Sequence, residues 1–186
     1  PGPEQGTAAK MNKIALTAIA TLLPISAFAA SAADPVQRII DIAKGRWETT
    51  ENNNTPDYFD KLDRDFSKSF AKVYREASKY PAYDGGDSPF DYDVITSSQD
   101  GCPLKDIKVA SESEKDGKAV VDASFRLMDC AEDPASKAKV SELKFDVVTE
   151  GGKPVINDIH RKTDDGKWDS LVSEMKEDIK AGQQQQ

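Results

Sequence analysis

The apolar residues of this chain change from a helical to a strand-like period near residue 105, and that change limits the folds open to it. Between residues 55 and 79 they recur every three or four positions, as in an amphipathic helix. From residue 105 to 160 they alternate instead, as in strands that bury one face. Helices followed by a run of strands indicate an α+β domain, with helices packed on one face of a curved antiparallel sheet. The helical stripe consists of Phe59, Leu62, Phe66, Phe70, Val73 and Ala77.

Three helices are expected. The first starts at Asp34, which can act as the N-cap before Pro35 at the first helical position. The second covers residues 55–79 and ends there because Tyr80 precedes a proline. A short closing helix is expected over residues 168–180. The apolar face of the first helix consists of Val36, Ile39, Ile40, Ala43 and Trp47.

About four strands are expected between the second and third helices. The alternating segments are residues 105–110, 119–128, 140–149 and 155–160, and turns containing glycine separate two of the pairs. We therefore predict one α+β domain over residues 34–181. The glutamine-rich residues 182–186 are expected to form a disordered tail.

Residues 11–33 have the order of a secretory signal peptide. A short cationic region opens at Met11, residues 14–25 are almost wholly apolar, and two A-x-A cleavage patterns follow. The apolar stretch is shorter than the roughly 20 residues that a membrane-spanning helix needs. We therefore expect a cleaved leader and a soluble periplasmic product, with a mature chain that starts near Ala30 or Asp34. Residues 1–10 precede Met11 and are interpreted as an upstream or cloning-derived extension.

Export decides how the two cysteines are interpreted. Cys102 and Cys130 are the only cysteines, and disulfides form and persist in oxidising compartments. A disulfide between them is expected. A redox-active pair is the weaker alternative, because the C-x-x-C spacing that lowers a thiol pKa is missing.

Composition excludes several classes of function. The formal net charge is −8 and the pI is about 4.8, which disfavours a nucleic-acid-binding surface. His160 is the single histidine, so a zinc site built from several histidines and cysteines is out of reach. Neither a phosphate-binding loop nor a G-x-S-x-G nucleophile motif is present. We expect no cofactor and no metal.

Three short segments carry a resemblance to a known family. The chain resembles exported bacterial proteins of domain-of-unknown-function family 3828, within the nuclear transport factor 2-like (cystatin-like) superfamily. This resemblance implies a cone of helices over a strongly bent sheet, and it implies export, but no agreed activity. The segments are Asp91-Tyr92-Asp93 with Gln99-Asp100, the strand Ile156-Asn157-Asp158-Ile159-His160, and Asp165-Gly166.

The same superfamily includes enzymes that use an aspartate or an Asp-His pair inside the cone. Asp158 and His160 lie two apart on one predicted strand and so share a face, together with Ile156. If that face is inside, Asp158 could orient His160 as a general base. If it is outside, both are solvated polar residues. They are weak catalytic candidates.

The segment after the second helix is the other candidate site. Tyr92, Asp93, Gln99 and Asp100 are predicted to line a pocket or an interaction surface. The aspartates could also bind calcium, but the D-x-[DN]-x-[DN]-G loop is missing. Capping and turn formation explain them better.

Three functions follow from these features. The first is a non-enzymatic exported domain, monomeric or homodimeric, that binds an unknown small ligand or a periplasmic protein. The second is an immunity or inhibitor protein against a toxin that acts in the periplasm, because negative charge steers such a protein to a basic enzyme. The third is a small isomerase or hydratase that uses Asp158 and His160.

Overall fold

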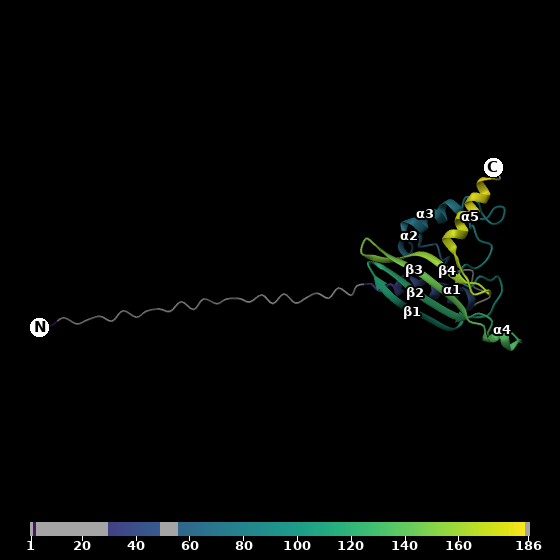
Figure 1. The fold of residues 1–186 in the computed structure, drawn as a ribbon, viewed down its shortest axis with the longest axis horizontal. Helices are drawn as coiled ribbons and strands as arrows, with labels where there is room; N and C mark the ends of the chain where they lie inside the picture. The colour runs from purple at the N-terminus through teal and green to yellow at the C-terminus, as the bar shows by residue number, and fades with distance from the viewer. Residues whose placement is uncertain (1, 3–29, 49–55, 185–186) are drawn as a thin grey trace.

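Five strands form one antiparallel sheet, in which every strand pairs with the next one along the chain. The computed structural model describes residues 2, 30–48 and 56–184, and Figure 1 shows their arrangement. The α+β class is confirmed, with one strand more than the sequence predicts. The strands are β1 (Lys105–Lys115), β2 (Lys118–Arg126), β3 (Ser141–Glu150), β4 (Lys153–Lys162) and β5 (Trp168–Ser170).

All the described helices except α4 lie on one face of the sheet or along its β4 side, and α4 protrudes beyond one end of the sheet (Figure 1). In Figure 1, α1 runs behind the strands, whereas α3 and α5 pack against each other and against β4. No helix in the described ranges is long and apolar enough to cross a bilayer. The helices are α1 (Ala33–Glu48), α2 (Leu62–Asp65), α3 (Lys68–Ala77), α4 (Pro134–Ala138) and α5 (Leu171–Gln183).

One hydrophobic core joins the helices to the inner face of the sheet. Ile39 and Ile40 of α1 are fully buried, as the sequence predicts for this face. Strand alternation directs every second side chain into the same layer. The buried residues of the three central strands are Ala119, Val121, Ala123 and Phe125 of β2, Leu143, Phe145 and Val147 of β3, and Val155, Ile156 and Ile159 of β4.

The start of α1 corrects one prediction. Asp34 lies inside the first turn rather than at the N-cap, and its Oδ2 accepts a hydrogen bond from the Ser31 N–H at 2.9 Å. In return, Ser31 Oγ accepts from the Ala33 N–H at 3.2 Å. This reciprocal arrangement is a capping box, in which two otherwise unpaired N–H groups are satisfied. Ser31 is thus part of the folded domain.

The capping box bears on the two predicted cleavage positions of the leader, most of which lies outside the described residues. Cleavage after Ala29 keeps Ser31, whereas cleavage before Asp34 removes it. If residues 11–33 are the leader that the sequence predicts, we expect cleavage after Ala29, and intact-mass spectrometry of the product of the full-length gene would show a chain that begins at Ala30. A chain that starts at Asp34 should lose about 1 kcal/mol of folding free energy, because it lacks the cap. A mature N-terminus at Asp34 with undiminished stability would contradict this.

The predicted helix over residues 55–79 is wrong in two respects. Residues 58–61 form turns, so helical structure starts only at Leu62 with α2. The helix is also interrupted at Phe66, which is extended and forms a parallel bridge to Ile156 of β4. Ser67 then starts α3: its N–H donates to the Ile156 carbonyl at 2.8 Å and its Oγ accepts from the Phe70 N–H at 3.1 Å. Phe66 and Phe70 still stack at 4.5 Å in the core. Leu62, Phe66, Phe70 and Ala77 of the apolar stripe are therefore buried, and Phe59 and Val73 pack partly buried against the same core, although the backbone is not one helix.

The closing segment also differs from the prediction. Residues 168–170 form β5 beside β4, and α5 begins only after Ser170, whose Oγ accepts from the Ser173 N–H. The helix continues to Gln183, two residues into the predicted tail, while residues 185–186 lie outside the described residues. The short helix α4 falls in a region expected to be a loop, where Asp133 caps it.

A disulfide joins Cys102 to Cys130, with Cα atoms 5.9 Å apart. The two residues flank the β1–β2 hairpin, and the Cys102 N–H donates to the Leu127 carbonyl at 2.9 Å. The bond therefore closes the base of that hairpin and anchors the end of the segment that precedes β1.

Removing this bond should destabilise the fold through the unfolded chain. We expect Cys102→Ala with Cys130→Ala to lower the free energy of unfolding by about 3–4 kcal/mol, because the uncrosslinked chain gains loop entropy. Urea denaturation followed by circular dichroism measures it. A reductant should destabilise the native protein by a similar amount and leave the double variant unchanged. Equal stability of the two oxidised proteins would refute the prediction.

Candidate functional site

Three open clefts meet at Tyr92, whose side chain lines all of them. The first, of about 960 Å³, lies between α5, the ends of β3 and β4, and residues 95–97. The second, of about 610 Å³, lies between the end of α1 and residues 83–99. The third, of about 510 Å³, lies between residues 80–91 and the last turns of α5. We call these three clefts together the Tyr92 surface.

A half-buried charge lies at the centre of the Tyr92 surface. Arg161 faces inward from the end of β4, opposite Leu143 of β3. Its guanidinium donates to the Tyr92 hydroxyl and forms an ion pair with Glu174 of α5, and its side chain is only 11% exposed. It also lies 5.3 Å from the centre of the Tyr92 ring. Because a desolvated guanidinium needs such partners, these contacts fix the positions of all three side chains.

Burial raises the pKa of Tyr92, and its hydrogen bond to Glu174 raises it further. The phenol therefore stays protonated and donates to Glu174 while it accepts from Arg161. Asp178, one turn along α5, has a raised pKa because it is partly buried and lies near Glu174 and Glu177. The carboxylates at this end of the domain thus experience one another's negative charge.

Acidic side chains outnumber basic ones on the Tyr92 surface by ten to four. An excess of one sign in a concave surface focuses the electrostatic field and attracts ions of the opposite sign. The acidic residues are Asp57, Asp87, Asp91, Asp93, Glu142, Asp164, Asp169, Glu174, Glu177 and Asp178, and the basic ones are Arg46, Lys139, Arg161 and Lys162.

Aromatic rings on the same surface can bind cations. Tyr83 lines the second cleft and is 57% exposed, and Trp168 lines the first and is 38% exposed. Trp168 already has two ammonium groups over its ring, from Lys144 at 5.4 Å and Lys162 at 6.0 Å. Cations bind to the faces of such rings through the ring quadrupole. The surface thus combines negative charge with cation-binding aromatic faces.

Asp93, a predicted pocket residue, holds the segment that carries Tyr92. Its Oδ1 accepts from the N–H groups of Ile95 and Thr96 at 3.0 and 2.9 Å, as in an Asx turn. Its Oδ2 accepts from the Tyr58 hydroxyl at 2.6 Å and from the Trp47 indole at 3.4 Å. Burial raises the pKa of Tyr58, and Asp93 raises it further. Asp93 therefore acts as a turn former, which is the alternative that the sequence favours.

The other two predicted pocket residues have different surroundings. Gln99 lines the second cleft, and its Nε2 donates to the Asp91 carbonyl at 3.0 Å. Asp100 is exposed and lines none of the three clefts. The structure thus brings together Tyr92, Asp93 and Gln99, and leaves Asp100 beside them.

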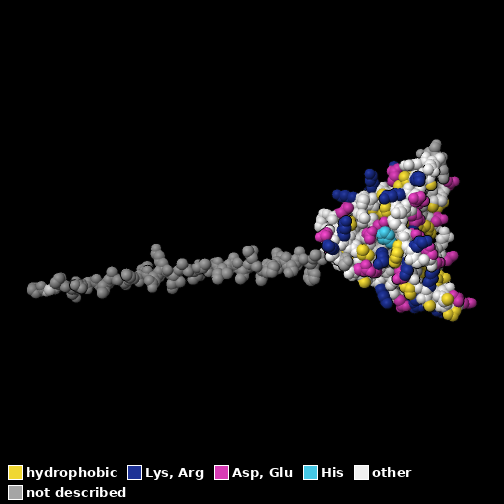
Figure 2. All heavy atoms as spheres, viewed as in Figure 1, with side chains coloured by type: hydrophobic (Ala, Val, Ile, Leu, Met, Phe, Trp, Pro, Cys, Tyr) yellow, Lys and Arg dark blue, Asp and Glu magenta, His cyan; other side chains and the backbone are white. Residues whose placement is uncertain are grey.

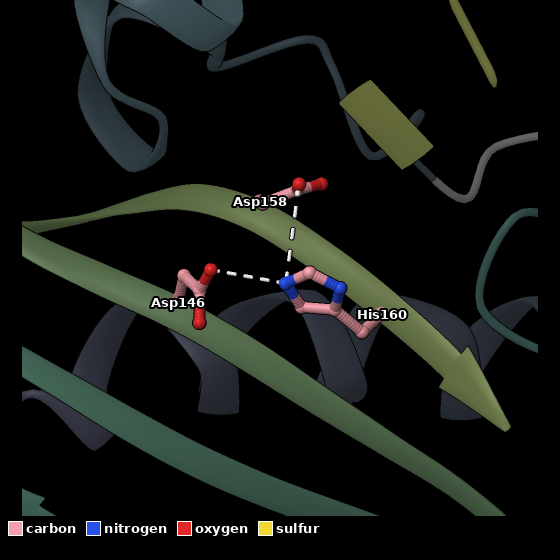
Figure 3. A group of neighbouring side chains, drawn as sticks. All are labelled: Asp146, Asp158 and His160. Carbon is pink, nitrogen blue, oxygen red and sulfur yellow. Dashed lines mark hydrogen bonds and ion pairs between the residues drawn. The ribbon is translucent and has the colours of Figure 1, made fainter. Parts of the chain in front are cut away.

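The weak catalytic candidates lie on the outer face of the sheet, away from α1 (Figures 2 and 3). Asp158 and His160 share that face, as predicted, but Ile156 does not. A register shift between β3 and β4 pairs Ile156 with Val147 and Asp158 with Asp146. This irregularity turns Ile156 into the core, because a bulge changes the face to which the following side chains point.

Asp158 accepts hydrogen bonds from the start of α5, and its Oδ2 is too far from His160 Nε2 for a hydrogen bond. Its Oδ1 accepts from the Ile159 and Val172 N–H groups, and its Oδ2 accepts from Ser170 Oγ at 2.6 Å. The nearer partner of His160 is Asp146, whose Oδ2 is 3.0 Å from Nε2, against 3.9 Å for Asp158.

The sequence analysis missed Arg161, Glu174 and Asp146. The strand pattern could have indicated Arg161. It lies two residues after Ile159 and so faces inward on the same strand, where a charged side chain needs a buried partner. Glu174 interrupts the predicted apolar face of the last helix and is that partner. Asp146 could not be found without the register of β3 against β4.

Comparison of the chain with protein-family models, with curated proteins and with solved structures gave no match. The resemblance to family 3828 and to the nuclear transport factor 2-like superfamily therefore stays a prediction. The function has to follow from the side chains themselves.

Asp93 and Asp100 offer a matched test of the site. We expect Asp93→Asn to lower the free energy of unfolding by about 2–3 kcal/mol, since half-buried donors lose a charged acceptor. Asp100→Asn, on an exposed carboxylate, should change it by less than about 0.5 kcal/mol. Chemical denaturation of both variants measures the difference. Equal effects would show that Asp93 does not hold this segment.

Proposed function

We propose that this protein is an exported, non-enzymatic binding domain that captures a cationic partner on the Tyr92 surface. The observation that carries the proposal is the excess of carboxylates around exposed aromatic rings in three adjoining clefts. Carboxylates pair with ammonium and guanidinium groups, and aromatic faces add cation–π attraction. The partner is a small polycation or a basic segment of another protein.

The position of the polar groups favours binding over catalysis. An isomerase or hydratase of the predicted type needs its aspartate and histidine in a shaped pocket. Here Asp158 and His160 lie on the outer face, and Asp158 already accepts hydrogen bonds from the start of α5. Arg161 and Glu174, at the centre of the Tyr92 surface, neutralise each other and position Tyr92.

Export and the superfamily belong to the same proposal. The Ser31 capping box supports cleavage after Ala29, and the disulfide suits an oxidising compartment. Helices packed on one face of an antiparallel sheet support a nuclear transport factor 2-like cone. The Tyr92 surface would then lie at the open end of that cone.

Binding of an arginine-rich octapeptide to the mature protein tests the proposal. We expect amide resonances of residues 92–97 and 168–177 to shift in NMR titrations, and affinity to fall as salt rises. Asp169→Asn with Glu177→Gln should weaken binding about three- to tenfold, because two exposed carboxylates of the first cleft are neutralised.

The matched control is Asp84→Asn with Glu132→Gln, which removes the same charge at exposed positions that line none of the three clefts. This variant should bind the peptide like the native protein. Equal weakening by both double variants would mean that net charge alone attracts the peptide, and the proposed site would be wrong. Absence of binding at low salt would also refute it.

The acidic surface favours a second candidate, an immunity or inhibitor protein for a basic toxin. Such inhibitors use complementary charge to speed association with their target. A toxin encoded by a neighbouring gene would be the natural partner. If its toxicity in the periplasm were suppressed by the native protein and not by the Asp169→Asn, Glu177→Gln variant, this more specific function would be supported. Full protection by that variant would argue against it.

A further inference from the structure

Three metal-ligating side chains converge on the outer face of the sheet, outside the Tyr92 surface. They are Asp146 of β3 and Asp158 and His160 of β4, and one ligand atom from each lies within 4.8 Å of the others. Figure 3 shows both carboxylates directed toward the Nε2 side of the imidazole. The register shift between β3 and β4 creates this grouping, because it places Asp158 opposite Asp146.

We propose that Asp146, Asp158 and His160 form a binding site for a divalent transition-metal ion such as Zn²⁺. Imidazole nitrogen and carboxylate oxygen are ligands that these ions accept, and water can complete the coordination. With bonds of about 2.0–2.2 Å, neighbouring ligand atoms stand about 3.0–3.4 Å apart. Asp146 Oδ2 is 3.0 Å from His160 Nε2 and already fits, and Asp158 Oδ2, at 3.9 Å, has to move closer by roughly half an ångström.

The surroundings hold one ligand in place before any ion binds. Ser170 Oγ donates to Asp158 Oδ2 at 2.6 Å, which leaves a lone pair of that oxygen for a metal. The Ile159 and Val172 N–H groups hold Oδ1 at 2.8 and 3.0 Å. Hydrogen bonds of this kind orient metal ligands and raise affinity.

The local charge also favours a cation. Two carboxylates and a neutral imidazole give the group a formal charge of −2, which a divalent ion cancels. Lys144, the cross-strand neighbour of His160, directs its ammonium to Glu112 and Asp122, 3.4 Å from each carboxylate. On metal binding, Nε2 gives its lone pair to the ion, and the single proton of the neutral imidazole lies on Nδ1.

A simple hydrogen bond between His160 and Asp146 is the competing explanation. It accounts for those two residues, and the hydrogen bonds from Ser170 Oγ and the Val172 N–H account for the position of Asp158. The two explanations differ in what Zn²⁺ should do. A hydrogen-bonded pair gives no stoichiometric binding, whereas a site binds one ion and makes the folded state more stable.

The experiment uses untagged mature protein, because a polyhistidine tag would itself bind zinc. His160 is the only histidine, so the imidazole nitrogens give one set of NMR signals. We expect one Zn²⁺ per chain by isothermal titration calorimetry, a large shift of the His160 Nε2 resonance, and a higher melting temperature. His160→Gln and Asp146→Asn should each weaken binding about tenfold or more.

Asp158→Asn is the sharper variant, since its amide oxygen can still accept from the Val172 N–H and keep α5 capped. It should fold normally and lose most zinc affinity, while Asp84→Asn, on an exposed loop, should bind zinc as the native protein does. Weak, multi-site binding that His160→Gln leaves unchanged, or bound zinc with an unshifted imidazole nitrogen, would overturn the proposal.

Discussion

The register of β4 against β3 is the constraint on which the other features of this domain depend. One irregularity, between Asp146 and Val147, lets Ile156 and Ile159 both face the core, although they are three residues apart. Ile156 then pairs with Phe66 and ends the first helical turn there, so that Ser67 can start α3. The same shift turns Asp158 and His160 outward together. With regular alternation, Ile156 would share the face of Asp158 and His160, so either both polar residues would be buried or Ile156 would be exposed.

A second constraint acts on the segment between α3 and β1. This segment has little regular structure, and it is anchored at defined points: Asp93 binds Tyr58, Trp47 and two backbone N–H groups, and Cys102 is fixed to Cys130. Between these anchors, Tyr92 reaches Arg161 and Glu174 on two other elements. The Tyr92 surface is therefore held by long-range contacts, which suits a binding surface that must be ordered before its partner arrives.

Much of the fold was predictable because it follows from local patterns. Alternation located the four longer strands, and pre-proline and capping rules placed the ends of two helices near their observed positions. The predictions failed where contacts between residues distant in the sequence decide the structure. The break at Phe66 comes from pairing with a strand 90 residues later, and β5 forms only because β4 offers a free edge. Only part of the candidate residues could be predicted, for the same reason. Tyr92 and Gln99 lie in one segment of the sequence. Tertiary contacts that no local pattern encodes bring in the others, which are Arg161, Glu174 and Asp146.

The two proposed sites would respond differently to the same solution, because they attract cations by different physics. On the Tyr92 surface, attraction comes from the excess of ten carboxylates over four basic groups, and at physiological ionic strength a screening length of about 8 Å weakens it. At Asp146, Asp158 and His160, a metal ion would make short coordination bonds to three atoms, and salt weakens these much less. The imidazole lone pair discriminates further, since it can form a coordination bond with a metal ion but only a hydrogen bond with an ammonium or guanidinium group. If both proposals hold, an organic cation on the Tyr92 surface and a metal ion on the outer face of the sheet would not compete for the same ligands.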